Sequence, residues 1–170
     1  EKGNRAAWLK ILGERVEIGM VEERDIKIIL NNPIDWEAFR DRTVLVTGAT
    51  GRLGMYIVEA ISKANIDWNL NITILALARS REKLQKVFGR SLQLPYIHTL
   101  VQDITEPISW EGNVHYIFHT AGLASPQDFT NQPVDTLWGH VQGTRNVLEL
   151  AREKKSQKVM YVSTVEIYGE

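Results

Sequence analysis

The sequence predicts an α/β fold built on a parallel, doubly wound sheet of about five strands. Short apolar segments with few charges alternate along the chain with longer segments of helical periodicity. Apolar strands are expected where helices cover both faces of a sheet, and this alternation favours parallel pairing. A glycine-rich loop directly after the first apolar segment is a third indication of this architecture. The expected strands span residues 43–47, 72–78, 97–101, 114–119 and 158–163.

Three helices are expected between these strands, each with apolar residues at helical spacing. The first follows the glycine loop, the second spans residues 81–88 and the third spans residues 134–154. The apolar positions are Leu53, Ile57, Ala60 and Ile61 in the first helix, Leu84, Val87 and Phe88 in the second, and Val134, Leu137, Val141, Val147, Leu148 and Leu150 in the third.

Residues 1–42 are charged and predict a helical N-terminal extension that packs on the main domain, residues 43–170. Residues 6–16 and 21–30 have helical patterns, and Asn32-Pro33 ends the second because a residue before proline leaves the helical region. Asp35 is expected to cap a short turn that holds Trp36 and Phe39. A partner-binding arm is the alternative interpretation of this segment.

The composition excludes several classes of protein. The chain has 170 residues, a net charge of −1 and no cysteine. The charge gives no indication of nucleic acid or an anionic membrane as partner, and no apolar run is long enough to cross a bilayer. The lack of cysteine excludes disulfides and thiolate zinc sites and fits a cytoplasmic location. No metal site is expected, because His115 and His119 would lie about 13 Å apart on a strand.

The segment Thr47-Gly48-Ala49-Thr50-Gly51-Arg52-Leu53-Gly54 has the spacing of a phosphate-binding loop between a strand and a helix. Gly48 permits the tight turn, Gly51 lets a pyrophosphate approach the backbone, and Gly54 lets the helix lie close to the sheet. The helix N-terminus offers N–H groups and a positive dipole end to phosphates. The residues expected to contact a dinucleotide here are Gly48, Thr50, Gly51, Arg52, Leu53 and Gly54.

This loop resembles the cofactor loop of the extended short-chain dehydrogenase/reductase family, the NAD(P)-dependent epimerases, dehydratases and decarboxylases of nucleotide sugars. The resemblance runs from about Thr43 to Gly169, because further family motifs follow the loop in order. It implies a Rossmann-type fold, an enzyme, NAD(P) as cofactor and a nucleotide sugar as substrate.

The end of the second strand bears on the choice of cofactor. An acidic residue there usually binds the ribose 2′-hydroxyl of NAD, but Ala78 stands at that position and Arg79 follows. A guanidinium can pair with a 2′-phosphate, so Arg79 favours NADP over NAD. Against this, the decarboxylases and dehydratases of the family that the chain resembles usually hold NAD. The basic residues that follow Arg79 also fit the solvated face of a helix.

Two later segments match family positions for the cofactor and the substrate. The resemblance implies that Asp103 and the backbone of Ile104 hold the adenine amino group. In His119-Thr120-Ala121-Gly122, it implies that Ala121 and Gly122 lie against the cofactor, while His119 has a structural role. Ser125 falls where the family often contacts substrate. The run Ala124-Ser125-Pro126 and the segments 103–107 and 133–136 resemble UDP-glucuronate decarboxylases in particular.

The segment 161–169 resembles the family signature that ends in Tyr-Gly. Thr164 then takes the place of the catalytic Ser/Thr, which also contacts the sugar, and Glu166 matches the Glu of dehydratases and decarboxylases. Val165 replaces the acid of one class of hexose dehydratases. His140 stands where the family often has Asn, so the role of that Asn in a proton path is in doubt.

The catalytic Tyr-x-x-x-Lys pair of the family does not occur in the 170 residues, and Tyr168 belongs to the Tyr-Gly of the signature instead. The lysine lowers the pKa of the tyrosine so that it can act as a base. We therefore expect a fragment, truncated before this pair, that binds cofactor weakly and turns over no substrate.

The function expected for the parent protein is oxidation and modification of a nucleotide sugar, with a homodimer as a possible assembly. Two alternatives stay open from the residues. One is an NADP-dependent reductase of a carbonyl or acyl substrate, which Arg79 favours. The other is a non-catalytic Rossmann protein that senses the cofactor.

Overall fold

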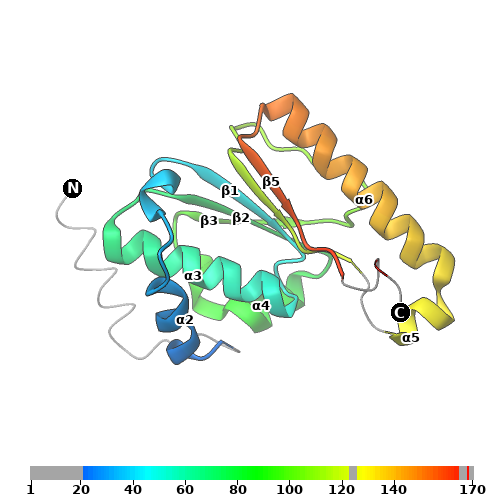
Figure 1. Cartoon of the computed structure of the whole chain (residues 1–170), viewed down its shortest axis with the longest axis horizontal. Coiled ribbons are helices and arrows are strands. Elements are labelled where there is room, and N and C mark those ends of the chain that lie inside the picture. The colour runs from blue at the N-terminus through cyan, green and yellow to red at the C-terminus, as the bar shows by residue number, and fades with distance from the viewer. Residues whose placement is uncertain (1–20, 123–125, 165–167, 169–170) are drawn as a thin grey trace.

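The computed structural model describes residues 21–122, 126–164 and 168, which form a five-stranded sheet flanked by helices (Figure 1). All four strand pairs are parallel, and the strand order is β3-β2-β1-β4-β5. This order confirms the predicted doubly wound, Rossmann-type sheet. The strands are β1 (Thr43–Thr47), β2 (Thr73–Ala78), β3 (Ile97–Val101), β4 (Tyr116–His119) and β5 (Lys158–Tyr161).

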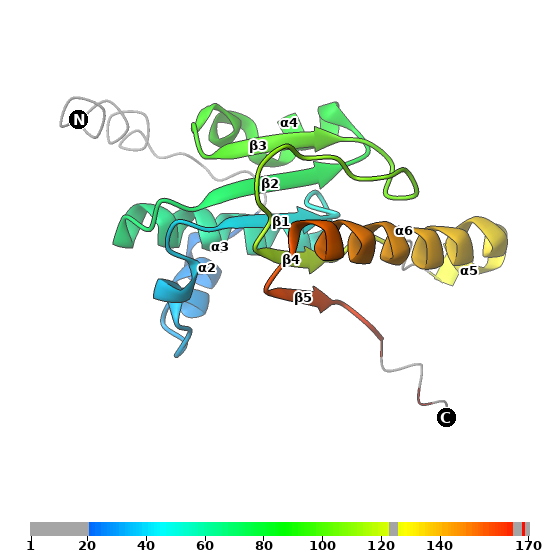
Figure 2. The same cartoon turned by 90° about the horizontal axis from the view of Figure 1, so that it is seen from above.

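Helices cover both faces of the sheet, as the apolar strands predicted (Figure 2). In β1, Val44 and Val46 belong to the core beneath α3 (Arg52–Trp68), and Leu45 belongs to the core beneath α6 (Pro133–Lys154). Alternate residues of a strand point to opposite faces, so the apolar centre of β1 supplies both cores. The remaining helices are α2 (Glu23–Leu30), α4 (Arg81–Phe88) and α5 (Pro126–Asn131), with short 3₁₀ turns η1 (Trp36–Phe39) and η2 (Gly89–Gln93).

The buried face of α3 differs from the predicted one at its first turn. Ala60 and Ile61 are buried as expected, and Ile57 is half-buried, but Leu53 is exposed. Gly54 and Val58 lie against the sheet instead. The helix begins at Arg52 beside the end of β1, and at Gly54 a side chain would collide with the backbone of Gly48 and Ala49.

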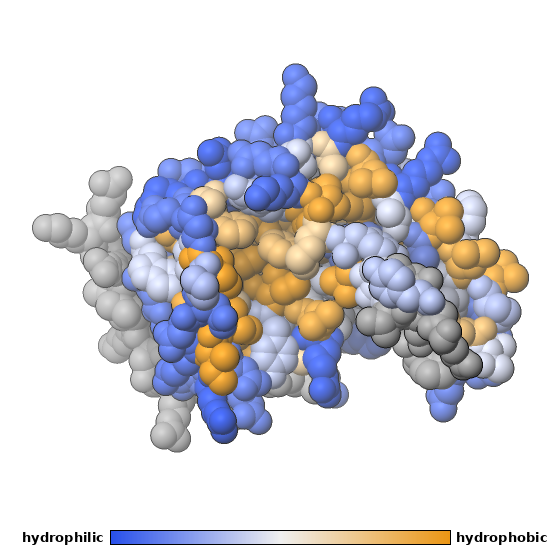
Figure 3. All heavy atoms as spheres, in the orientation of Figure 1, coloured by the Kyte–Doolittle hydropathy of each residue, from blue (hydrophilic) through white to orange (hydrophobic). Residues whose placement is uncertain are grey.

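The apolar positions expected in α6 are buried only in part, and all those of its N-terminal half are exposed. Val147 and Leu150 are buried, but Val134, Leu137, Val141 and Leu148 are exposed, with Val134 75% exposed. The C-terminal half covers the sheet, while the other half extends past the ends of the strands toward α5 (Figure 2). Hydrophobic side chains therefore remain on the surface along α6 (Figure 3).

The described part of the N-terminal segment packs closely on the sheet domain. Ile26 of α2 is buried in the same core as α3, and Tyr56 Oη donates a hydrogen bond of 2.7 Å to Asp25 Oδ2. The ring of Phe39 lies 4.8 Å from the ring of Tyr116. The short turn forms at Trp36–Phe39, but the Asp35 side chain does not cap it as expected. The helix expected over residues 6–16 lies outside the described residues.

Glu59 is a buried carboxyl on α3 that the sequence did not single out. It is 4% exposed, and no described residue bonds its Oε1. Burial raises the pKa of Glu59 to about 7, and burial also raises the pKa of nearby Tyr96 to about 12. The uncharged form of Glu59 therefore suits this position better than the carboxylate.

The unfolded chain ionises Glu59 near the ordinary glutamate pKa of 4.5, whereas the folded chain resists ionisation up to about pH 7. Stability contributed by the neutral group is complete below pH 4.5 and declines as pH rises toward 7. We expect Glu59→Gln to remove this decline and to raise the free energy of unfolding at pH 8 by roughly 2–3 kcal/mol. Urea unfolding at pH 5 and pH 8 measures the effect, with exposed Glu111→Gln as the control. A parallel pH profile in wild type and Glu59→Gln would contradict it.

Candidate cofactor-binding site

The carboxyl ends of four strands meet at one edge of the sheet and carry most of the residues expected to bind a cofactor. Gly48 follows β1, Arg79 follows β2, Asp103 follows β3, and Ala121 follows β4. The chain runs outward from β1 to β2 and β3, and then crosses back to β4 on the other side of β1. Ligands of open α/β sheets bind at such a switch point.

Gly48 makes the turn that leaves β1, with a φ of +65°. A Cβ at this position would lie 2.8 Å from the backbone N and Cα of Ala121. Both the backbone conformation and the space therefore require glycine. The loop is held against the chain segment that directly follows β4, as the tight turn in the sequence predicted.

Gly54 has no room for a side chain, because a Cβ there would contact Gly48 O and lie 2.9 Å from Ala49 Cα. The helix thus approaches the loop as closely as the predicted packing role of Gly54 requires. Gly51 precedes the helix in an extended conformation, and its N–H donates to Gly48 O over 2.8 Å. The first turn, with Arg52 and Leu53 exposed and Thr50 half-buried beside it, faces this edge of the sheet.

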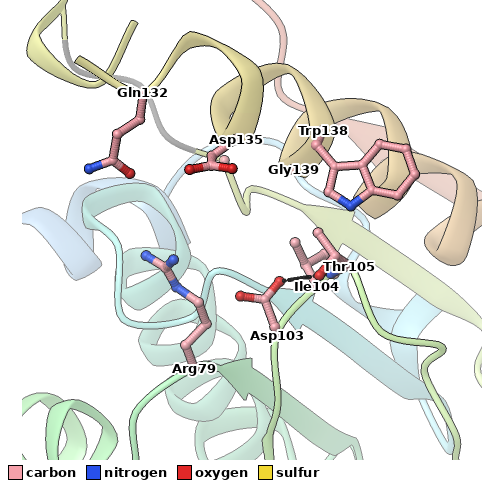
Figure 4. Close-up of a pocket in the computed structure, with 9 residues that line it drawn as sticks. Arg79, Asp103, Ile104, Thr105, Gln132, Asp135, Trp138 and Gly139 are labelled. Atoms are coloured by element: carbon pink, nitrogen blue, oxygen red, sulfur yellow. Dashed lines mark hydrogen bonds between the residues drawn. The ribbon is translucent and has the colours of Figure 1, made fainter.

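A cavity of about 330 Å³ lies beside the loop, between the strand ends and the N-terminal half of α6 (Figure 4). Arg79, Asp103, Ile104 and Gly122, all expected at the site, line it. The sequence did not identify the lining residues that α6 and its start contribute, namely Gln132, Asp135, Trp138 and Gly139. A tryptophan beside an apolar helical stripe was the available signal, but the stripe itself predicts a buried face rather than the wall of a site.

Asp103 is fixed by the turn that it begins. Its Oδ1 accepts hydrogen bonds from Thr105 N at 2.9 Å and Thr105 Oγ1 at 2.8 Å. The bond from the Thr105 N–H lowers the pKa of Asp103, and the charge of Arg79 adds to this effect. An ionised carboxylate therefore faces the cavity near neutral pH, as a hydrogen-bond acceptor.

Ile104 is anchored from α6. Asn146 Nδ2 donates to Ile104 O over 2.9 Å, and a Cβ at Gly143 would lie 3.0 Å from Ile104 Cγ1. Gly143 therefore lets α6 approach the turn after β3. This contact holds one wall of the cavity at a fixed distance from the helix.

His119 links three elements from within the core. It is 1% exposed, its Nδ1 lies 2.7 Å from Thr47 Oγ1, and its Nε2 lies 3.4 Å from Thr144 Oγ1. Burial lowers the pKa of His119 to about 4, and the charge of His140 adds to this effect. The ring is therefore neutral near pH 7, in agreement with the structural role expected for it.

Gly122 faces His140, the residue that stands where the resembling family often has Asn. A Cβ at Gly122 would contact the His140 ring. The imidazole thus occupies the space beside the chain that follows β4. The departure from the family motif changes the shape of this wall of the site.

The residues expected on the substrate side are only partly described. Thr164 is exposed beyond β5 and does not line the cavity. Tyr168 is exposed. Ser125 and Glu166 lie outside the described residues.

The family model for the NAD dependent epimerase/dehydratase family matches residues 44–170. The chain belongs to this family. The match covers the sheet and the helices between its strands, and it begins within β1.

Two curated relatives of this epimerase/dehydratase domain illustrate the similarity. UDP-glucuronic acid decarboxylase 6 of Arabidopsis thaliana is 32% identical over 130 residues, which cover 75% of this chain and 35% of the relative. UDP-glucose 4-epimerase of Rickettsia rickettsii is 29% identical over 130 residues, which cover 74% of this chain and 37% of the relative. The chain therefore spans about a third of the length of these relatives.

Solved structures show the same fold. The domain matches UDP-glucose 4-epimerase from Bifidobacterium longum in complex with NAD+ and UDP with a TM-score of 0.59 and 19% sequence identity. The match covers 75% of this chain and 38% of the epimerase.

Within the ranges that the structure describes, no helix is long and apolar enough to cross a membrane.

Gly48→Ala tests the close approach of the loop to Ala121, in the chain segment after β4. We expect it to lower the free energy of unfolding by about 2–4 kcal/mol, because the new Cβ adds a backbone clash to the strain of a positive φ. Gly89→Ala is the matched control, since Gly89 also has a positive φ but a Cβ there would meet nothing within 4 Å. Urea unfolding of both variants compares the costs, and equal losses would show that no clash occurs at Gly48.

Proposed function

We propose that this chain is the cofactor-binding part of an NAD(P)-dependent enzyme that epimerises, decarboxylates or dehydrates a nucleotide sugar. The observation that carries the proposal is the cavity at the carboxyl ends of the strands, which is lined by Arg79, Asp103 and Gly122. The curated relatives, named as UDP-glucuronic acid decarboxylases and UDP-glucose 4-epimerases, support the substrate class.

The geometry of the loop fits a dinucleotide. Side chains are excluded at Gly48 and Gly54, so bare backbone and the N-terminus of α3 face the space where a pyrophosphate would bind. Asp103 and the anchored Ile104 would hold the adenine, and Arg79 would lie beside its ribose. Ala121 and Gly122 would lie against the rest of the cofactor. A bound nicotinamide would supply the hydride acceptor and donor of the reaction.

The sugar side of the site is proposed from the family motif. Thr164 would donate a hydrogen bond to the reacting sugar hydroxyl, Ser125 would contact the substrate, and Glu166 would act beside them. β5 is parallel to its neighbour β4. Thr164 and Ala121 therefore both follow the carboxyl ends of strands, at the same edge of the sheet. The protein would contribute orientation and electrostatics to the reaction.

Arg79 is the observation that favours a second candidate, an NADP-dependent reductase. It is exposed at the end of β2 and lines the cavity. The predicted preference for NADP is based on this guanidinium alone, and it stays a prediction from the sequence. A cytoplasmic location and a homodimer of the parent protein stay predictions as well.

Calorimetric titration of the chain with NAD tests the proposed cofactor site. We expect binding, and we expect Asp103→Ala to weaken it by about tenfold, because the ligand loses one hydrogen bond that it donates to a charged acceptor. Asp67→Ala is the control, because Asp67 pairs with Lys63 near the opposite end of α3. Circular dichroism checks that both variants fold. If Asp103→Ala and Asp67→Ala bound NAD equally well, the adenine role of Asp103 would be wrong. No binding by the wild-type chain would overturn the proposed function.

A further inference from the structure

The cavity beside the loop contains one cation and two anions among its lining residues. Arg79 enters from the end of β2, Asp103 from the end of β3, and Asp135 from the first turn of α6. The other lining residues are uncharged, so the lining carries a formal charge of −1. Figure 4 shows the guanidinium of Arg79 and both carboxylates directed toward the same space.

We infer that Asp135 is a specificity-determining residue, which makes this cavity accept a dinucleotide with a free ribose 2′-hydroxyl and disfavour a 2′-phosphate. The inference rests on the proposed function, because it concerns the adenosine half of the same cofactor site. It reverses the preference that Arg79 alone predicts.

The first reason is the balance of charge around the ribose position. A 2′-phosphate carries close to two negative charges near neutral pH, and it would enter a space where two carboxylates already offset the guanidinium. A hydroxyl brings no charge and can donate a hydrogen bond to a carboxylate. The lining therefore suits the neutral group.

The second reason is that a ligand can occupy the space between these charges. No described residue forms an ion pair with Arg79 or Asp135 within 4 Å, so the two side chains face each other across the cavity without contact. Asp103 uses Oδ1 for Thr105, and no described residue bonds its Oδ2. Both carboxylates therefore retain acceptor oxygens for a ligand.

The third reason is that Asp135 is held by a helix rather than by a loop. Pro133 is the first residue of α6. The N–H of Thr136, the residue after Asp135, donates to Gln132 O over 2.9 Å. The positive end of the helix dipole favours a carboxylate in the first turn. The helix thus fixes the backbone of Asp135 at the edge of the cavity.

Binding of ADP-ribose and of 2′-phospho-ADP-ribose tests the inference, because these probes contain only the adenosine half of the cofactor and differ by the phosphate. For the wild-type chain, we expect calorimetry to give binding of ADP-ribose that is about tenfold tighter. Asp135→Asn should strengthen binding of the phosphorylated probe by about tenfold and so bring the affinities of the two probes close together. The gain should shrink at high salt, because the interaction is between charges.

Two further variants separate this charge effect from other causes. Adding Arg79→Gln to Asp135→Asn should remove the gain, since the freed guanidinium provides the attraction. Glu149→Gln is the matched control, because it removes one negative charge from an exposed position of the same helix outside the cavity. It should leave the ratio of the two affinities unchanged.

The outcomes distinguish the inference from the proposed function. If ADP-ribose bound but Asp135→Asn and Glu149→Gln had the same effect on the ratio, Asp135 would have no role in specificity. Tighter wild-type binding of the phosphorylated probe would also overturn the inference, and the cofactor site would stand as an NADP site. If neither probe bound the wild-type chain, the cofactor site itself would be wrong and the inference would fail with it.

Discussion

The contact between the turn at Gly48 and the chain that follows β4 is the constraint on which the rest of the site depends. The backbone at Gly48 lies so close to Ala121 that a single added carbon would collide with it. This proximity sets the position of the loop, and the loop sets the position at which α3 begins. Thr47 strengthens the junction, because its hydroxyl meets His119 and accepts a hydrogen bond from the Ala121 N–H over 3.3 Å. The edge of the sheet is thus assembled from the core outward.

Buried polar groups have opposite consequences in the two cores. His119 is paired on both ring nitrogens and stays neutral, so it connects β1, β4 and α6 without the cost of a buried charge. Glu59 has an oxygen that no described residue bonds, and its burial favours the protonated form. One group joins the elements around the site, whereas the other makes the opposite core sensitive to pH. A buried polar residue therefore needs its partners to be known before its role can be assigned.

The sequence predicted the elements of the sheet well, because local pattern determines them. β1, β3 and α4 have the expected bounds, and the other strands differ by one or two residues at their ends. The pattern could not show how far each helix overlaps the sheet, so it did not reveal that the apolar Val134, Leu137 and Val141 stay exposed. It also could not show that Asp135 and Arg79 line the same cavity, because they lie more than fifty residues apart along the chain. The glycine loop was recognisable because its chemistry is contiguous, while the charges that line the cavity come from three separate elements.

The parallel arrangement also determines the order in which the chain can become structured. β1 is central, and hydrogen bonding between Thr43 and His115 joins residues that are 72 positions apart. β1 can pair with β2 early, but its other edge must wait until the chain has passed through α3, α4 and β3. During synthesis from the N-terminus, an apolar strand edge therefore stays open while these elements are made. The described N-terminal segment contacts α3, which emerges before β4, so a partial core can form on one face of the sheet during that interval.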